Sequence, residues 1–301
     1  MDNSSHIVFF ETLFNNKYKI SAFTLSGGVI FILISLFFSD VYRSSAVVKI
    51  SQNEEDLAGL SRNLEGLASL AGANISTSSQ SKSPEYVKEI LDSVSFFKEL
   101  DLSLDVLPEV YASNGYDKSS DKIIYNSRYY DEKNQSWIRN SKFMRPSKPS
   151  YEETHYYFMN DFNVSIDRKT GFINLSYDHY SPFFAKKFLE QAITILNEQE
   201  RTKDRVNSQE SIDYIKKILA STTNSAIKES LIFLLQEQIK KNMLTTVNSD
   251  YLVDYIERPT LPWKKIFPRK SIFGIVGSLL FLTFSLCFYL IRHLYLKRVD
   301  S

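Results

Sequence analysis

The sequence predicts an α+β membrane protein in which two transmembrane helices flank an α/β base that carries a long helical-hairpin arm. Two apolar runs, 20–38 and 271–291, stand near the ends of the 301-residue chain. Each is close to the ~20 apolar residues that a helix needs to cross a bilayer. Strand-like and helix-like patterns alternate between the runs, and one polar stretch of high helix propensity predicts an unusually long helix.

The composition gives no reason to expect a nucleic-acid partner. The chain has 36 Lys and Arg against 35 Asp and Glu, a net charge of +1, so no basic excess attracts phosphates. Its single cysteine, Cys287, lies inside the second apolar run. A domain without cysteine suits an oxidising compartment, although many cytosolic domains also lack cysteine.

The first apolar run predicts a retained membrane anchor. It carries no charge between Lys19 and Asp40, the region before it is long, and no small-x-small cleavage site follows it. These features disfavour a cleaved signal peptide. A buried core helix is the alternative for both runs, but such helices rarely run this long without a charge. The predicted organisation is a tail, a span, a domain, a second span and a second tail: 1–19, 20–38, 39–270, 271–291 and 292–301.

The charges beside the spans do not decide which side of the membrane holds the domain. Basic residues of the tails are Lys17, Lys19, Arg292, Lys297 and Arg298. Those at the ends of the domain are Arg43, Lys49, Lys264, Lys265, Arg269 and Lys270. The positive-inside rule slightly disfavours an outside domain, but large domains translocate largely regardless of such charges.

The first half of the domain is predicted to mix strand and helix. The β-branched stretch 41–50 predicts a strand. Leucines at three- and four-residue spacing in 57–73 predict a helix with one apolar face, and 74–83 has the composition of a loop. Ser83 followed by Pro84 predicts a helix start. That helix would reach about residue 95, and a second short helix would follow near 96–104.

The middle of the domain contains the clearest strand signal. Residues 114–150 are polar and poor in periodicity, and a helix is predicted from 151 to 161. Apolar and polar residues alternate in 162–177 on both sides of a turn at 168–171. The glycine of this turn permits a positive φ, so a β-hairpin is expected.

The last part of the domain predicts a helical-hairpin arm over about 182–247. Pro182 opens a helix that reaches about residue 219, roughly 57 Å at 1.5 Å per residue. Its stretch 197–211 is almost wholly polar and is predicted to be solvated. The sequence STTNS at 221–225 predicts a turn, and 226–244 predicts a second helix with one apolar face. A homo-oligomer would cover that face.

Candidate packing residues lie on the arm and in the second span. In the span, small residues on one helical face would let another helix approach closely, although ordinary glycine use is an equal alternative. Ser26, Gly27 and Gly28 form a similar face in the first span. The candidates are Gly274, Gly277, Ser278, Leu231 and Leu235.

The sequence predicts no catalytic, cofactor-binding or metal site. It contains no glycine-rich phosphate loop and no serine in a G-x-S-x-G context. The clusters Asp178-His179 and 152–155 are contiguous, and adjacent residues point in different directions. The chain is therefore not expected to be an enzyme. Four aromatic residues could stack on sugar rings, but core packing is the preferred interpretation: Tyr125, Tyr129, Tyr130 and Trp137.

Several stretches, in this order and spacing, resemble the Wzz chain-length determinants, the polysaccharide co-polymerases of bacterial inner membranes. They are Leu67–Gly72, Ile124–Trp137, Asp167–Ser176 leading into Ser181, Pro182 and Ala185, Met243–Tyr251, and a proline segment with Pro259, Pro262 and Pro268. The chain departs from the family in having Glu257-Arg258-Pro259 where an Asp-Pro-Ala run is usual.

The resemblance implies a regulator of polysaccharide chain length that sets the modal length of O-antigen or a related glycan. It implies a ring-like homo-oligomer without cofactors, which works with a Wzy-type polymerase; the growing lipid-linked glycan is a further candidate partner. It also implies a two-pass protein of the inner membrane with both termini cytoplasmic and the domain periplasmic. The main alternative is a capsule polysaccharide export adaptor that works with an ABC transporter. A membrane sensor and a tethered periplasmic hydrolase are weaker alternatives.

Overall fold

The computed structural model describes residues 14, 16–51, 82–139, 146–247 and 250–299. The chain forms two compact units. One combines residues 1–41 with 264–301, and the other comprises residues 42–263. The predicted helix at 57–73 and most of the loop after it lie outside the described residues.

The first unit is built from two long apolar helices. They are α2 (Lys17–Ser35) and α10 (Lys270–Val299), with the short strand β9 (Lys265–Phe267) before α10. Both helices are long and apolar enough to cross a membrane, by length and composition. Large apolar side chains such as Leu25 and Ile275 are more than half exposed on their surface. Two apolar helices near the ends of the chain fit a two-pass membrane protein.

The second unit contains an antiparallel sheet with strand order β6-β7-β1-β8. Its strands are β6 (Phe162–Ile166), β7 (Ile173–His179), β1 (Val41–Ile50) and β8 (Val253–Glu257). The β6–β7 hairpin pairs Phe162 with Tyr177, and Gly171 in its turn has a φ of 72°. The predicted strand at 41–50 and the predicted hairpin are confirmed.

Helices cover this sheet and complete the core. They are α4 (Pro84–Leu91), α5 (Val94–Leu104), α6 (Leu107–Tyr111), α7 (Tyr151–Asp161) and the first half of α8 (Pro182–Ser221). Serine caps begin four of them, because Ser83, Ser93, Ser150 and Ser181 each accept a bond from an amide three residues later. Phe158 stacks on Phe162 of the sheet with ring centroids 4.8 Å apart, and Phe188 stacks on Tyr177 with ring centroids 4.1 Å apart.

One helix prediction was wrong in detail, and four short strands in the middle of the domain were not predicted. The helix that begins at Pro84 ends at Leu91, because Ser93 caps a separate helix, α5. The stretch described as poor in periodicity contains two small antiparallel pairs. They are β2 (Ser113–Asp117) with β3 (Lys122–Tyr125), and β4 (Tyr130–Asp131) with β5 (Ser136–Trp137).

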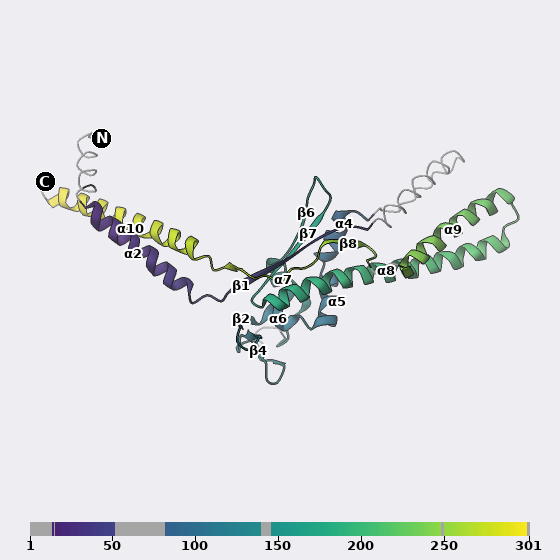
Figure 1. The fold of residues 1–301 in the computed structure, drawn as a ribbon, viewed down its shortest axis with the longest axis horizontal. Coiled ribbons are helices and arrows are strands. Elements are labelled where there is room, and N and C mark those ends of the chain that lie inside the picture. The colour runs from purple at the N-terminus through teal and green to yellow at the C-terminus, as the bar shows by residue number, and fades with distance from the viewer. Residues whose placement is uncertain (1–13, 15, 52–81, 140–145, 248–249, 300–301) are drawn as a thin grey trace. The chain divides into compact units, whose positions relative to one another are not determined.

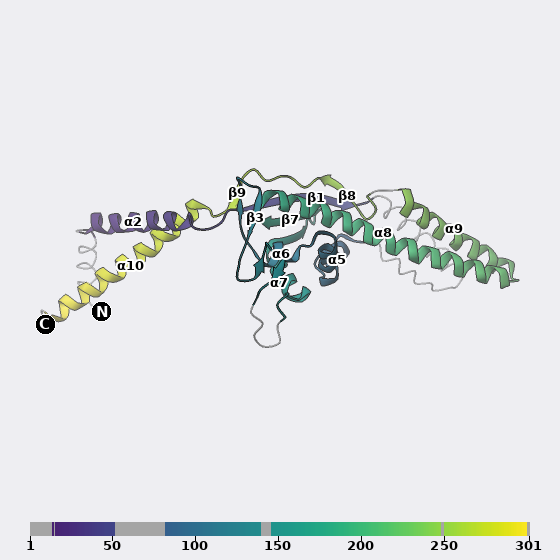
Figure 2. The ribbon, with the colours of Figure 1, turned by 90° about the horizontal axis from the view of Figure 1, so that it is seen from below.

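A helical hairpin continues from this body. The 40 residues of α8 extend about 60 Å at 1.5 Å per residue. α9 (Ser225–Val247) follows after the turn at 222–224 and packs antiparallel to the second half of α8. In Figures 1 and 2, α8 starts beside the sheet and continues past it to the turn. The root of this hairpin, where α8 leaves the sheet, holds the candidate site.

Candidate functional site

The middle of α8 carries a polar face that is buried. Asn197, Glu200, Asp204 and Ser208 are each at most 5% exposed. The prediction that 197–211 is solvated was therefore wrong for this face. These residues stand three or four positions apart and continue the apolar stripe of the first half of the helix. The spacing of three or four residues indicates that they share the buried face of the helix. Because the residues are polar, however, the stretch was predicted to be solvated.

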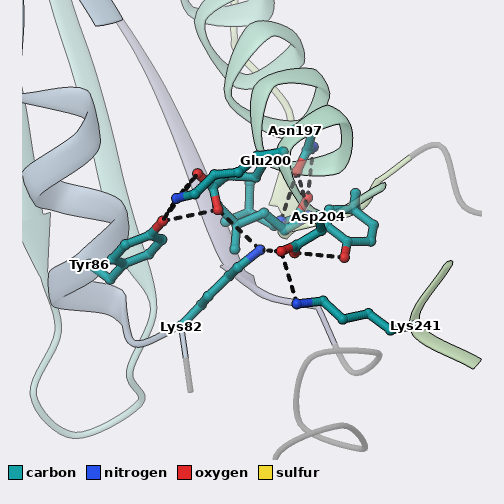
Figure 3. Close-up of polar contacts among 10 residues, drawn as sticks. Lys82, Tyr86, Asn197, Glu200, Asp204 and Lys241 are labelled. Atoms are coloured by element: carbon teal, nitrogen blue, oxygen red, sulfur yellow. Dashed lines mark hydrogen bonds and ion pairs between the residues drawn. The ribbon is translucent and has the colours of Figure 1, made fainter. Parts of the chain in front are cut away.

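Asp204 lies at the centre of this cluster, shown in Figure 3. Its carboxylate accepts from Lys82 Nζ at 2.5 Å and from Lys241 Nζ at 2.9 Å. The hydroxyl of Tyr251 also donates to it at 2.8 Å. One carboxylate thus joins the segment before α4, the end of α9 and the segment before β8.

Glu200, one turn earlier on α8, extends the cluster toward α4. The Tyr86 hydroxyl donates to its two oxygens at 3.1 and 3.0 Å. Lys82 Nζ lies 3.1 Å from the carboxylate, and Lys203 Nζ lies 3.3 Å from it. Lys82 therefore bridges both carboxylates of the helix, as Figure 3 shows.

Asn197 fastens the last strand of the sheet to α8. Its side-chain oxygen accepts from the amides of Leu252 and Val253 at 2.8 and 2.9 Å. Its amide nitrogen donates to the carbonyl of Val253 at 3.1 Å. One side chain thereby provides the hydrogen-bond partners of three buried backbone groups at the start of β8. These bonds fix the position of the strand along the helix.

The electrostatics of the cluster favour ionised carboxylates. Burial alone would raise the pKa of Asp204, but the charges and hydrogen bonds of Lys82 and Lys241 outweigh it, and this pKa lies below the ordinary value. A hydrogen bond to Tyr86 raises the pKa of Lys203, against its partial desolvation. These groups bind one another at the root of the hairpin. We call the set the clasp: Lys82, Tyr86, Glu200, Asp204, Lys241 and Tyr251.

A second carboxyl, that of Glu109 on α6, is half-buried and has no ion-pair partner among the described residues. The Tyr125 hydroxyl donates to its Oε1 at 3.0 Å. Among the described residues, its buried Oε2 has no hydrogen-bond partner. Burial raises the pKa of Glu109 to about 7. The clasp and Glu109 therefore differ in whether the carboxyl has a counter-charge.

Members of the two contiguous clusters of the sequence contact separate partners in the structure. Asp178 pairs with Arg43 at 2.6 Å, whereas His179 is buried, and its Nδ1 accepts from the Ser181 amide at 3.1 Å. Burial lowers the pKa of His179 to about 4, which keeps the ring neutral. In the other cluster, Glu153 pairs with Arg139 at 2.6 Å. Within the described ranges, no group of three or more His, Cys, Asp or Glu could hold a metal ion.

The small residues of the spans meet within one chain. A Cβ added at Gly277 would lie 2.7 Å from the carbonyl oxygen of Gly27 and 2.5 Å from Phe31. One added at Gly28 would lie 2.5 Å from the Ser278 hydroxyl, and one at Gly274 would lie 3.1 Å from Ile32. The structure thus brings Gly274, Gly277 and Ser278 together against α2. Their role between copies of the chain stays a prediction.

The arm candidates and the proline segment lie apart from the clasp contacts. Leu231 and Leu235 are half-buried on α9. Other apolar residues of α9 are exposed: Ile227 (50%), Ile232 (45%), Phe233 (39%), Ile239 (39%) and Met243 (62%). In the proline segment, Pro259 and Pro268 are buried and Pro262 is half-buried. The Thr260 amide donates to the Ser45 carbonyl at 3.2 Å, which holds the start of this segment on β1.

The aromatic candidates mainly contact other aromatic rings. Tyr130 is 8% exposed, and its ring centroid lies 5.1 Å from that of Trp137 and 5.3 Å from that of Tyr125. Tyr129 packs against Tyr111 at 5.5 Å. These contacts favour packing as the role of the four residues over an open platform for a sugar.

No protein-family model matches the chain. No curated protein matches it significantly.

Solved structures of similar fold do match. A full-length bacterial polysaccharide co-polymerase is 13% identical, covers 96% of this chain and 97% of its own, and gives a TM-score of 0.39. A fragment of WzzB, a polysaccharide co-polymerase from Salmonella Typhimurium, is 16% identical, with coverages of 76% and 100% and a TM-score of 0.32. A mutant of the Shigella flexneri lipopolysaccharide O-antigen chain-length regulator WzzBSF is 11% identical, with coverages of 75% and 100% and a TM-score of 0.23.

The structural neighbours are thus polysaccharide co-polymerases, the family that the sequence resembles.

Proposed function

We propose that this chain regulates polysaccharide chain length as an oligomeric scaffold in the bacterial inner membrane. It sets the modal length of O-antigen or a related glycan by acting with a Wzy-type polymerase, and it carries out no bond chemistry itself. Residues 39–270 lie in the periplasm, and both termini lie in the cytoplasm. Copies of the chain form a ring, and the growing lipid-linked glycan is a further partner.

The observation that carries this proposal is the construction of the helical hairpin. A buried ionic clasp fastens its root within a single chain, whereas apolar side chains of α9 such as Ile227 and Met243 remain exposed. A firmly rooted element with an uncovered apolar face suits a scaffold that is completed by neighbouring copies. The stretches that resemble the chain-length determinants, together with two spans that hold the domain at the membrane, support the same function.

The deciding experiment compares the surface glycan with and without the gene. In a host that carries the flippase and polymerase of the glycan, deletion should replace a modal band on the gel by a distribution that falls steadily with length. The cloned gene should restore the band. Unchanged chain lengths with loss of glycan from the cell surface would instead identify the export adaptor, and an unchanged ladder with intact export would reject both functions.

The topology has its own test. Alkaline phosphatase fused after Asn224, in the turn between α8 and α9, should be active because that turn is proposed to lie in the periplasm. Activity of a cytoplasmic reporter at the same position would overturn the orientation without affecting the fold.

A further inference from the structure

A group of cations stands where the second span begins. Lys264, Arg269 and Lys270 are exposed, and Lys270 is the first residue of α10. Among the described residues, no ion pair involves any of the three. We call them the cationic collar. Because α10 is apolar enough to span a membrane from this end, the collar lies at the level of lipid headgroups.

The collar also lies at an electrostatically unfavourable end of the helix. The N-terminus of a helix carries a partial positive charge, so acidic residues are favoured there and basic ones are not. The first turn of α10 contains no acidic residue. The backbone N–H groups at this end add to the positive potential of the collar.

The nearby carboxylate does not offset this charge. Asp40, just after α2, pairs with Lys265 at 2.6 Å. Lys264, Lys265, Arg269 and Lys270 give +4, and Asp40 gives −1, so the segments 35–41 and 264–270 together carry +3. An anion from outside the chain would satisfy both this charge and the helix end.

Aromatic rings fix the two segments beside the collar. The ring centroid of Phe38 lies 5.8 Å from that of Phe267 and 5.6 Å from that of Phe273. Phe267 and Phe273 are 6.0 Å apart, so the three rings form one cluster. Phe37, the residue before Phe38, is 91% exposed. Apolar surface beside exposed cations matches an amphiphile with an acyl chain and an anionic headgroup.

We propose that the cationic collar, Lys264, Arg269 and Lys270, binds the phosphate headgroup of an anionic phospholipid at the membrane surface. The headgroup phosphate accepts from the collar side chains near the N-terminus of α10, and the acyl chains lie along the spans. This interaction holds the start of α10 at a fixed depth in the bilayer. The inference goes beyond the proposed function and does not depend on it.

Trp263, the residue before Lys264, provides a local probe. The chain has two tryptophans, so Trp137→Phe leaves one reporter. The full chain is reconstituted in phosphatidylcholine vesicles that contain a small, equal fraction of either brominated phosphatidylglycerol or brominated phosphatidylcholine. Brominated phosphatidylglycerol should quench Trp263 more strongly. The relative association constant of the anionic lipid should fall about fivefold for each collar cation that is removed at low salt.

The test variant is Lys264→Gln, Arg269→Gln and Lys270→Gln together. The matched control removes three exposed cations from the arm: Lys216→Gln, Lys217→Gln and Lys228→Gln. The collar variant should lose the preference for phosphatidylglycerol, whereas the control should keep it. If the triple variant does not fold, as judged by circular dichroism, Arg269→Gln alone should show the fivefold loss. Equal quenching by the two lipids in the parent chain, or equal losses in both triple variants, would overturn the proposal.

Competing anions identify the occupant. Unlabelled phosphatidylglycerol should restore the fluorescence that its brominated form quenches. Inorganic pyrophosphate should not, because it has no acyl chain to hold it in the bilayer. If polyprenyl diphosphate competes at a far lower mole fraction than phosphatidylglycerol, the collar is a site for a lipid diphosphate and the assignment to phospholipid is wrong.

Discussion

The root of the helical hairpin and the face of α9 invert the usual relation between polarity and burial. At the root, Glu200 and Asp204 are charged and at most 5% exposed. On α9, Ile227 and Met243 are apolar and at least half exposed. In both regions, the exposed fraction of a side chain depends on whether another segment packs over it. The root is covered by its own chain and is paired charge by charge, whereas the α9 face has no cover within the described part of the chain.

The comparison predicts that substitutions at the root destabilise the single chain, whereas those on the exposed face of α9 act mainly between chains. The largest effect is expected for Asp204→Ala. It leaves Lys82, Lys241 and the Tyr251 hydroxyl without their shared acceptor, and removal of one member of a buried ion pair costs about 3 kcal/mol or more. For a domain of this size, the melting temperature of the purified chain in detergent should fall by about 10 °C.

The matched control is Asp213→Ala, which removes an exposed carboxylate from the same helix. It should change the melting temperature by less than about 2 °C, since surface substitutions are usually within about 0.5 kcal/mol. Equal effects of the two substitutions would mean that the clasp does not stabilise the root.

Glu109→Gln sharpens the comparison by testing a half-buried carboxyl that has no cation partner in the described part of the chain. The pKa of Glu109 rises from 4.5 to about 7 on folding, so the folded chain holds a proton that the unfolded chain has released between these values. Stability therefore falls as the pH rises through this window. Glutamine keeps the oxygen that accepts from Tyr125 and carries no charge, so the variant should be about 2 kcal/mol more stable at about pH 8.

The gain from Glu109→Gln should disappear below about pH 3.5, where the carboxyl is almost fully protonated in both states. Thermal unfolding of the parent chain and of Glu109→Gln, from this acidic pH up to about pH 8, measures the gain in stability. The substitution Glu99→Gln, at an exposed position on α5, should give no pH-dependent gain. A uniform gain at all pH values would show that packing, and not charge, limits the Glu109 site.

Sequence patterns predicted the elements whose signal lies within a short stretch of the chain. The strand 41–50 was predicted from its β-branched residues, and the hairpin around Gly171 from alternation and turn chemistry. The helix Tyr151–Asp161 was predicted with its observed bounds. The turn between α8 and α9 was also predicted. The pairs formed by β2 to β5 were missed, because strands of two to five residues are too short to show a period.

The clasp could not be predicted because its members are far apart in the sequence. Lys82 and Asp204 are separated by 122 positions. A polar run on a helix is usually solvated, and only the spacing of Asn197, Glu200 and Asp204 continued the buried stripe. Recognising the site required knowing which segments cover that face.

Lys241→Gln is expected to have a smaller effect than Asp204→Ala. Lys241 lies near the end of α9 and reaches Asp204 at 2.9 Å, but about a third of its side chain is exposed. Solvent screening reduces the value of such a pair, so a loss of about 1 kcal/mol is expected. Lys240→Gln, at the exposed neighbouring position, is the control and should be neutral. If both are neutral, Lys82 and Tyr251 are enough to hold the root.

The smallest effect on the stability of the single chain, together with a large effect on assembly, is expected for Ile227→Asp. Leu231 and Leu235 are half-buried by their own chain, so charges there would disturb both folding and assembly. Ile227 is 50% exposed in the first turn of α9, where an acidic residue is favourable for the helix. The melting temperature of the detergent-solubilised monomer should therefore change by less than about 2 °C.

In the oligomer, however, the same carboxylate would have to enter an apolar contact between copies, and burying an unpaired charge costs several kcal/mol. Crosslinking in cells should show fewer oligomers of Ile227→Asp, and the modal glycan band should shift or vanish while polymerisation continues. Ser230→Asp adds the same charge at an exposed polar position of α9 and should keep both the oligomer and the band. Wild-type assembly and a normal ladder for Ile227→Asp would show that Ile227 does not lie in the interface between copies. An effect equal to that of Ser230→Asp would trace the change to charge alone, and the α9 face would then need no partner.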